Sequence, residues 1–239
     1  MLTSMKSWLA DHLPQSFVGA LDFYRYPEQL DSWGGPFNGQ CFRQTIFIDL
    51  VRACNFDAVI ETGTYRGSTT LFLALNSGGA PVYTSEINPR FFELARRRLR
   101  AIPNIQMYNT DSLKFLSTLN QSDNGCKFFY LDAHWLKDLP LADETTFIAR
   151  NFRTFAIMID DFQVANDPGY GYDDYGPGKS LSLRDFPFDS DPRFVAYFPA
   201  RHSTEESGRR RGCIVLASPD LKDKIDLLGC LVKVEQFRQ

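Results

Sequence analysis

The stretch 57–70 constrains the fold of this chain more than any other part of the sequence. It starts with an apolar run typical of a buried strand, reaches Glu61, and passes through Gly63 and Gly67 into a helix expected to begin near Ser68. Glycine lets a backbone come close to a ligand, and the first turn of a helix has unpaired N–H groups. The stretch therefore predicts a strand, turn and helix that hold a nucleoside-type cofactor at the carboxyl end of the strand.

The glycine spacing narrows the kind of cofactor. It is Glu-x-Gly-x-x-x-Gly, and not the Gly-x-Gly-x-x-Gly of a dinucleotide site. A second strand, expected at 81–85, is followed by Glu86. An acidic residue in that place can accept hydrogen bonds from both hydroxyls of a ribose, as it does in NAD sites. Together, the turn and Glu86 resemble the first two motifs of class I S-adenosylmethionine-dependent methyltransferases.

Strand and helix patterns alternate over 57–160, which indicates a parallel sheet with helices on both faces. Two further strands with a short connection follow a long loop and predict an antiparallel pair. The fold class is therefore α/β, with a Rossmann-like, seven-stranded, mostly parallel sheet and a C-terminal antiparallel pair. Strands are expected at 57–61, 81–85, 104–109, 127–132, 155–160, 193–198 and 212–217, and helices at 68–76, 89–100, 111–119 and 141–151.

Residues 1–50 precede the first strand and contain many aromatic residues, which are too apolar for a free tail. We interpret them as a helical cap segment, followed by one methyltransferase-like domain over 51–239. An alternative gives Asn38, Gln40 or Arg43 a direct contact with cofactor or substrate.

Composition excludes several classes of function. The 239 residues carry a net charge of −3, which argues against nucleic acid or an anionic membrane as partner. The five cysteines are scattered and include no Cys-x-x-Cys pair, as expected in a reducing compartment. There is no signal peptide and no apolar stretch of 18 residues, so we expect a cytoplasmic protein. A homo-oligomer is left open.

Three aspartates follow neighbouring strands of the predicted sheet. Asp132 ends the fourth strand, and Asp160 and Asp161 end the fifth, so all three should lie at the edge where Glu61 and Glu86 also lie. Crowded carboxylates repel one another, and a hard divalent cation is the simplest way to stabilise them. The alternative for each aspartate alone is a helix cap or a turn.

With these aspartates, residues 40–218 resemble the Mg²⁺-dependent O-methyltransferases of the catechol and macrocin type. The resemblance rests on the runs 61–69, 131–135 and 159–161, with Glu86 and the pair Asp111–Ser112. It implies that S-adenosylmethionine and Mg²⁺, or another hard divalent cation, are the cofactors. It implies that the cofactor is bound by Glu61 and Gly67 of the turn, by Gly63, Tyr65 and Thr69 at the methionine part, by Glu86 at the ribose, by Asp111 and Ser112 at the adenine, and by Asp132. It also implies that Asp132, Asp160 and Asp161 bind the metal.

The chain departs from the catechol type in two places and looks more like the macrocin type. Catechol-type enzymes have Asn where this chain has Asp161, whereas macrocin-type enzymes have Asp. The run 132–137 also contains one residue more than the catechol-type Asp-His-Trp-Lys. The resemblance thus implies methyl transfer to a hydroxyl of a small acceptor, such as a sugar or another natural product.

The residue that takes the hydroxyl proton has three candidates, His134, Lys137 and the metal-bound Asp132. The loop 163–180, rich in glycine and tyrosine, is expected to cover the acceptor; a surface loop is the alternative. The arginines 209–211 predict an exposed turn, with contact to substrate or to a second subunit as the alternative.

Two other classes of function remain as hypotheses. A metal-dependent oxidoreductase of the cephalosporin hydroxylase type has a similar fold and acidic site, although the chain has only three histidines for a two-His-one-carboxylate centre. A non-catalytic S-adenosylmethionine-binding protein is the other hypothesis, and the complete glycine turn and set of acids argue against it.

Overall fold

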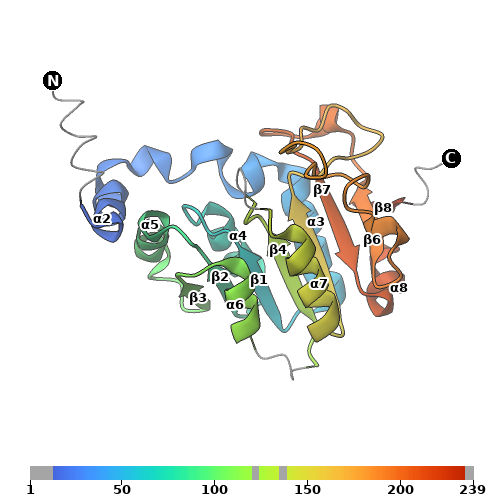
Figure 1. Ribbon diagram of the computed structural model, residues 1–239, viewed down its shortest axis with the longest axis horizontal. Helices are drawn as coiled ribbons and strands as arrows, with labels where there is room; N and C mark the ends of the chain where they lie inside the picture. The colour runs from blue at the N-terminus through green and yellow to red at the C-terminus, as the bar shows by residue number, and fades with distance from the viewer. Residues whose placement is uncertain (1–12, 120–123, 135–138, 235–239) are drawn as a thin grey trace.

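The computed structural model describes residues 13–119, 124–134 and 139–234. One sheet of eight strands runs through it, in the order β3-β2-β1-β4-β5-β7-β6-β8 (Figure 1). The first five are parallel and the last three antiparallel. The strands are β1 (Ala58–Thr62), β2 (Val82–Ser85), β3 (Ile105–Tyr108), β4 (Lys127–Leu131), β5 (Phe155–Asp160), β6 (Val195–Pro199), β7 (Cys213–Ala217) and β8 (Leu231–Lys233).

This arrangement confirms the predicted fold class and adds one short strand to it. The predicted antiparallel pair is β6 and β7, and β8 pairs with the outer edge of β6. β8 has only three residues, and a run that short has no clear periodicity in sequence.

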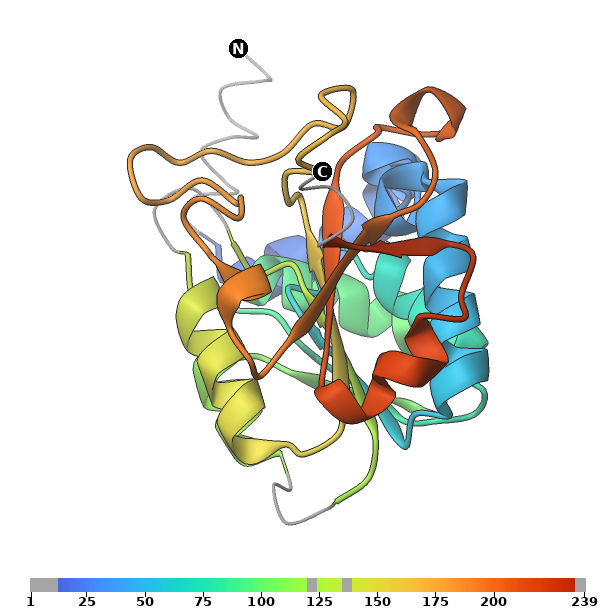
Figure 2. The same cartoon turned by 90° about the vertical axis from the view of Figure 1, so that its right-hand side faces the viewer.

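Helices cover both faces of the sheet (Figure 2). One hydrophobic cluster contains buried side chains of α6 and α7, and the other contains those of α3, α4 and α8. Consecutive residues of β5 alternate between the clusters, which is why this strand is apolar throughout. The helices are α2 (Gln15–Arg25), α3 (Cys41–Cys54), α4 (Ser68–Asn76), α5 (Pro89–Leu99), α6 (Ser112–Thr118), α7 (Leu141–Asn151) and α8 (Lys222–Ile225).

The N-terminal segment consists of α2, three short 3₁₀ turns and α3. α2 packs closely on α5, where a Cβ at Gly19 would lie 2.0 Å from the carbonyl oxygen of Arg90. The turns η1 (Pro27–Gln29), η2 (Ser32–Gly34) and η3 (Pro36–Gly39) then lead along one edge of the fold to α3 (Figure 1). The predicted domain boundary at residues 50 and 51 falls inside α3.

One feature of the N-terminal segment bears on the site. Trp33, Phe37 and Asn38 have positive φ angles, which residues other than glycine adopt rarely.

No helix of the described residues is both long and apolar enough to cross a membrane.

Candidate active site

A cleft of about 910 Å³ lies where the parallel strands end, near the upper limit of about 1,000 Å³ for small-molecule sites. Its walls come from the turn after β1, the ends of β2, β4 and β5, the start of α6, the N-terminal segment and the residues before β7. Six residues predicted to bind cofactor line it: Gly63, Tyr65, Glu86, Asp111, Ser112 and Asp132. The other three, Glu61, Gly67 and Thr69, are not part of its lining.

The glycines of the turn are needed for packing within the protein. Gly63 has φ +90°, and a Cβ there would lie 2.3 Å from the carbonyl oxygen of Asp132. Gly67 has φ +76°, and a Cβ there would lie 3.0 Å from Leu99 Cδ1. The sequence analysis predicted that both glycines allow a ligand to approach closely. In the structure, a Cβ at Gly63 would meet the backbone of Asp132, directly after β4, and a Cβ at Gly67 would meet Leu99 of α5.

Glu61 lies beneath the cleft and is fully buried. Its Oε2 accepts hydrogen bonds from the hydroxyls of Thr70, at 2.5 Å, and Thr84, at 2.6 Å. Burial raises the pKa of Glu61 to about 7. Glu61 therefore links the end of β1 to α4 and β2.

Thr69 holds the N-terminal segment, because its Oγ1 accepts a hydrogen bond from the Phe37 N–H at 3.2 Å. The sequence gives no signal for this contact between residues 32 positions apart. Asp111 is the N-cap of α6 and accepts a hydrogen bond from the Lys114 N–H at 2.8 Å. It nevertheless lines the cleft beside Ser112.

Glu86 links the glycine turn after β1 to the end of β2. Its Oε2 accepts from the Tyr65 N–H at 2.7 Å, and its Oε1 accepts from the Asn88 N–H at 2.8 Å. A carboxylate has about four lone-pair sites, so two hydrogen bonds leave acceptor capacity for a ligand. Burial raises the pKa of Glu86.

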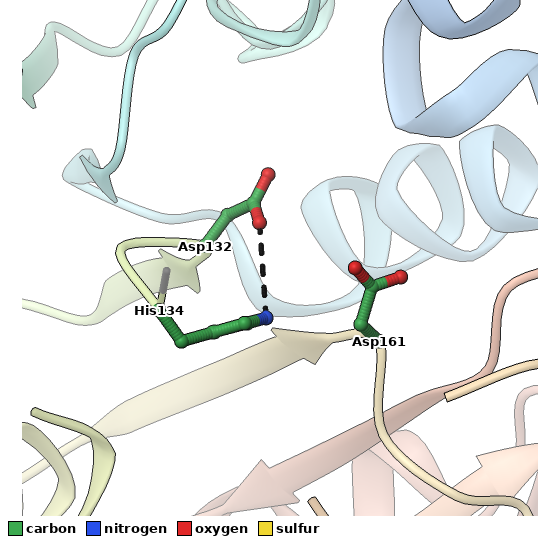
Figure 3. A group of neighbouring side chains, drawn as sticks. All are labelled: Asp132, His134 and Asp161. Atoms are coloured by element: carbon green, nitrogen blue, oxygen red, sulfur yellow. Dashed lines mark ion pairs between the residues drawn. The ribbon is translucent and has the colours of Figure 1, made fainter. Parts of the chain in front are cut away.

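At the far side of the cleft, Asp132, His134 and Asp161 form a group whose potential ligand atoms all lie within 4.8 Å of one another (Figure 3). The Nε2 of His134 is 3.9 Å from Asp132 Oδ1. It is buried and has no hydrogen-bond partner among the described residues. Burial lowers the pKa of His134, so its imidazole is neutral at pH 7. Burial, followed by the charges of Asp161 and Glu61, raises the pKa of Asp132 well above its ordinary value.

Asp160 lies next to this group but is occupied by contacts within the protein. It is 2% exposed and forms an ion pair with Arg43. It also accepts hydrogen bonds from the Tyr130 hydroxyl at 2.8 Å, the Asn38 amide at 3.2 Å and the Asp161 N–H at 2.9 Å. The sequence analysis predicted Asp160 as a metal ligand. In the structure, each Asp160 oxygen has two contacts within the protein, whereas His134 lies with Asp132 and Asp161.

Arginines from distant parts of the sequence neutralise this acidic end of the cleft. Arg211 donates from Nε to Asp161 Oδ1 at 2.6 Å and also pairs with Asp173. Arg209 and Arg211 both line the cleft, which favours the alternative interpretation of the run 209–211 as a contact for substrate. Sequence reasoning counted the carboxylates here but missed their partners, because Arg43 and Arg211 lie 117 and 50 residues from the aspartates they contact.

The loop 163–180 contributes one residue to the cleft, Asp173. Tyr175 donates to Asp173 Oδ2 at 2.6 Å, whereas Tyr170 is buried and donates to the Arg201 carbonyl at 3.0 Å. Tyr172 and Asp174 are not part of the cleft lining. Lys137, the second predicted base, lies outside the described residues.

Comparisons with known proteins give a fold but no sequence family. No family model matches the chain, and no curated protein matches it in sequence. Among solved structures, the O-methyltransferase from Bacillus cereus in complex with SAH is 17% identical, with a TM-score of 0.57 over 90% of this chain and 97% of that one. The cofactor-bound Rv0187 from MTB is 19% identical, with a TM-score of 0.58 over 90% of this chain and 95% of that one.

A third similar structure is the O-methyltransferase TomG from Streptomyces achromogenes, which is involved in tomaymycin synthesis and was solved in complex with SAM. It is 16% identical and has a TM-score of 0.54 over 74% of this chain and 79% of that one. The chain therefore has the Rossmann-like fold of these O-methyltransferases.

Proposed function

We propose that this protein transfers a methyl group from S-adenosylmethionine to a hydroxyl of a small acceptor, with a divalent cation at the acceptor end of the cleft. One observation carries the proposal. A single cleft joins the turn at Gly63 and the carboxylate of Glu86 to the group Asp132, His134 and Asp161. The turn and Glu86 suit a nucleoside cofactor, and the second group suits a metal ion that binds the acceptor.

Each wall of the cofactor end has a role in this proposal. Glu86 accepts hydrogen bonds from the ribose hydroxyls with the lone pairs that Tyr65 and Asn88 leave free. Asp111 and Ser112 flank the adenine, and Gly63 and Tyr65 lie along the methionine part. The excess of carboxylates in the cleft favours a ligand with a sulfonium cation.

The residues of the acceptor end fit a divalent cation. The Nε2 of His134 is a buried lone pair without a hydrogen-bond partner among the described residues, and a ligand atom there would satisfy it. Two carboxylates and one neutral imidazole form a ligand set that suits Mn²⁺ or Fe²⁺ as well as Mg²⁺. A bound cation lowers the pKa of an acceptor hydroxyl and orients its oxygen. Asp160, in contrast, positions Arg43 and the end of β5.

This ligand set also bears on the base. A neutral imidazole has only one nitrogen with a free lone pair, so His134 cannot bind the metal and accept the hydroxyl proton at the same time. Asp132 and Lys137 then remain of the three predicted bases. The oxidoreductase hypothesis requires a second histidine, but His202 lies outside the cleft, 3.6 Å from Asp167, and His12 is not among the described residues.

The acceptor that we propose is a hydroxyl of a sugar or another natural product. TomG, a protein of the same fold, is involved in the synthesis of a natural product, which supports this class of acceptor. All five cysteines are free thiols, which supports a reducing, cytoplasmic environment.

Calorimetry with S-adenosylhomocysteine and Mn²⁺ or Mg²⁺ tests the two halves of the proposal separately. We expect His134→Ala to retain cofactor affinity and to lose metal affinity by at least about 10-fold. His202→Ala is the matched control and should retain both affinities. Absence of cofactor binding by the wild type at every metal concentration would overturn the proposal, and metal binding unchanged in His134→Ala would overturn the ligand set.

A second experiment tests the reaction itself. Wild-type protein with S-adenosylmethionine and metal is incubated with sugars, catechols and polyketides, and mass spectrometry detects products that have gained one methyl group. Methylation on oxygen supports the proposal, whereas methylation only on nitrogen or carbon would contradict it.

A further inference from the structure

Charges are unevenly distributed around the cleft. Six carboxylates line it, from Glu86, Asp111, Asp132, Asp160, Asp161 and Asp173. Two arginines line it as well, and Arg211 is already paired with Asp161 and Asp173. Arg209, in contrast, has no carboxylate partner within the described part of the chain. Of the two arginine side chains that line the cleft, Arg209 is therefore the one that can pair with a negatively charged group of a ligand.

The side chain of Arg209 is held in place by an aromatic ring. Its guanidinium carbon lies 3.9 Å from the centroid of the Trp33 ring, well within the roughly 6 Å limit for a cation–π contact. Stacking occupies the face of the guanidinium and leaves the N–H groups at its edge free to donate. Trp33 lines the cleft as well. The pair thus offers an oriented set of donors to the cleft.

The side chains of Trp33 and Arg209 are exposed, but the backbones around them pack closely. The Arg209 N–H donates to the Asn38 carbonyl at 3.1 Å, and the Ser207 hydroxyl donates to the Gly39 carbonyl at 2.8 Å. A Cβ at Gly208 would lie 2.3 Å from that Asn38 oxygen. Figure 2 shows the orange-red segment that includes η5 (Ser203–Glu205) beside the blue N-terminal segment.

The backbone of Trp33 supports the same interpretation. It has φ +67° and ψ +11°, a left-handed conformation that is unfavourable for a residue other than glycine. Such a conformation persists only where the surroundings fix it, and it concentrates at ligand sites. Here it belongs to the residue whose ring contacts the guanidinium of Arg209, and both residues line the cleft.

We propose that Arg209, stacked on Trp33, binds a negatively charged carboxylate or phosphate group inside the cleft. This inference rests on the proposed methyltransferase function for the identity of the ligands. Two sources can supply the anion: the carboxylate of the methionine part of the cofactor, or an acidic group on the acceptor. In either case, the site selects the ligand through a bidentate hydrogen bond from the guanidinium.

Two binding measurements on the full chain distinguish these sources. The first is calorimetry of S-adenosylhomocysteine and of methylthioadenosine, which lacks the amino-acid part, with wild type and Arg209→Gln. The second is a titration with inorganic phosphate, with and without S-adenosylhomocysteine, followed by tryptophan fluorescence. Phosphate binding to the protein alone requires no cofactor, so it tests the anion site even if the methyltransferase proposal fails.

The cofactor carboxylate is the source if Arg209→Gln binds S-adenosylhomocysteine about 10-fold or more weakly while methylthioadenosine binding is unchanged. The acceptor is the source if cofactor binding is unchanged and phosphate saturates the cofactor-loaded wild type but not Arg209→Gln. Arg209→Lys should recover only part of the affinity, because lysine lacks the fork of donors.

Arg201 provides a matched control. Its guanidinium also stacks on a ring, 5.2 Å from the centroid of Phe42, but it does not line the cleft. Arg201→Gln should leave every affinity unchanged. The proposal is overturned if Arg209→Gln changes the affinity for neither S-adenosylhomocysteine nor phosphate, or if it weakens S-adenosylhomocysteine and methylthioadenosine equally. It is also overturned if phosphate binds equally well to the wild type and to Arg209→Gln.

Discussion

The two ends of the cleft stabilise their carboxylates in different ways. At the cofactor end, neutral donors hold Glu61 and Glu86: the hydroxyls of Thr70 and Thr84, and the N–H groups of Tyr65 and Asn88. At the acceptor end, Arg43 and Arg211 hold Asp160 and Asp161. The donors of the cofactor end lie within 23 residues of their carboxylates, whereas those arginines lie at least 50 residues away.

Glu61 and Glu86 thus have partners close in sequence, whereas Asp160 and Asp161 have arginine partners that are distant in sequence. A carboxylate held by nearby neutral donors keeps its place whenever the strand and its turn form. A carboxylate paired with a distant arginine depends on the packing of the whole domain. Changes at the acceptor end should therefore affect stability most, whereas changes at the cofactor end should affect mainly titration and ligand binding.

The largest effect is expected from Arg43→Met. It removes the buried partner of Asp160, and an uncompensated buried charge costs about 3–5 kcal/mol of unfolding free energy. Denaturant unfolding measures this loss. Arg52→Met is the control on the same helix, because Arg52 is 77% exposed and its pair with Asp49 should contribute less than about 1 kcal/mol.

A double variant sharpens the same test. Arg43→Met with Asp160→Asn removes both charges, so it should be less destabilised than Arg43→Met alone. Equal losses in the two variants would mean that the packing of Arg43 matters more than the charge of Asp160, and the contrast between the two ends would fail.

The next effect concerns pH. Glu61 keeps its proton in the folded protein up to about pH 7, whereas its ordinary pKa is 4.5. The stability linked to this proton is complete below pH 4.5 and is lost as the pH rises to about 7, by at most about 3 kcal/mol. Glu144, buried on α7 with a pKa of about 7, adds to the same trend.

Substitution of Glu61 measures its contribution to the pH dependence of the unfolding free energy. Glu61→Gln has no proton to lose, so the decrease in unfolding free energy between pH 4.5 and pH 7 should become smaller. The double variant with Glu144→Gln should flatten it further. Urea unfolding at several pH values measures the slope, and a slope that is unchanged in both variants would contradict the role of these carboxyl groups.

A smaller effect, on binding, is expected from Glu86→Gln. Loss of a charged acceptor at the ribose should weaken S-adenosylhomocysteine binding by about 10-fold, since hydrogen bonds to charged groups contribute about 1.5–3 kcal/mol. Calorimetry measures it. Glu93→Gln is the control, because Glu93 pairs with Arg96 and Arg97 on α5 and does not line the cleft. Full affinity in Glu86→Gln would exclude the ribose contact.

The smallest effect is expected from Thr69→Val, which removes the acceptor for the N–H of the buried Phe37. An unmade hydrogen bond of this kind costs about 1–3 kcal/mol, and we expect the lower value because the Thr69 side chain is only partly buried. Thr45→Val is the control, since its hydroxyl donates at an exposed site within α3. We therefore expect a lower midpoint of thermal unfolding for Thr69→Val than for Thr45→Val, and equal midpoints would contradict this prediction.

Sequence reasoning predicted the sheet well because the signals are local. Strand periodicity, glycine turns and caps act over a few residues, so the predicted helices at 68–76 and 141–151 coincide with α4 and α7. The position of Glu86 in the wall of the cleft was predicted in the same way, because this residue directly follows β2. The sequence analysis also predicted that Asp132 and Asp161 lie close together, but it did not predict that His134, and not Asp160, completes their group.

The sequence by itself determined the first seven strands in chain order, the edge at which the carboxylates gather and the position of the glycine turn after β1. Each of these depends on contacts between residues close in the chain or on the rule that parallel strands end at a common edge. Only the tertiary structure decided which carboxylates remain available to a ligand. That outcome depends on Arg43, Arg211 and the Trp33–Arg209 pair, whose partners are brought together by the packing of distant segments.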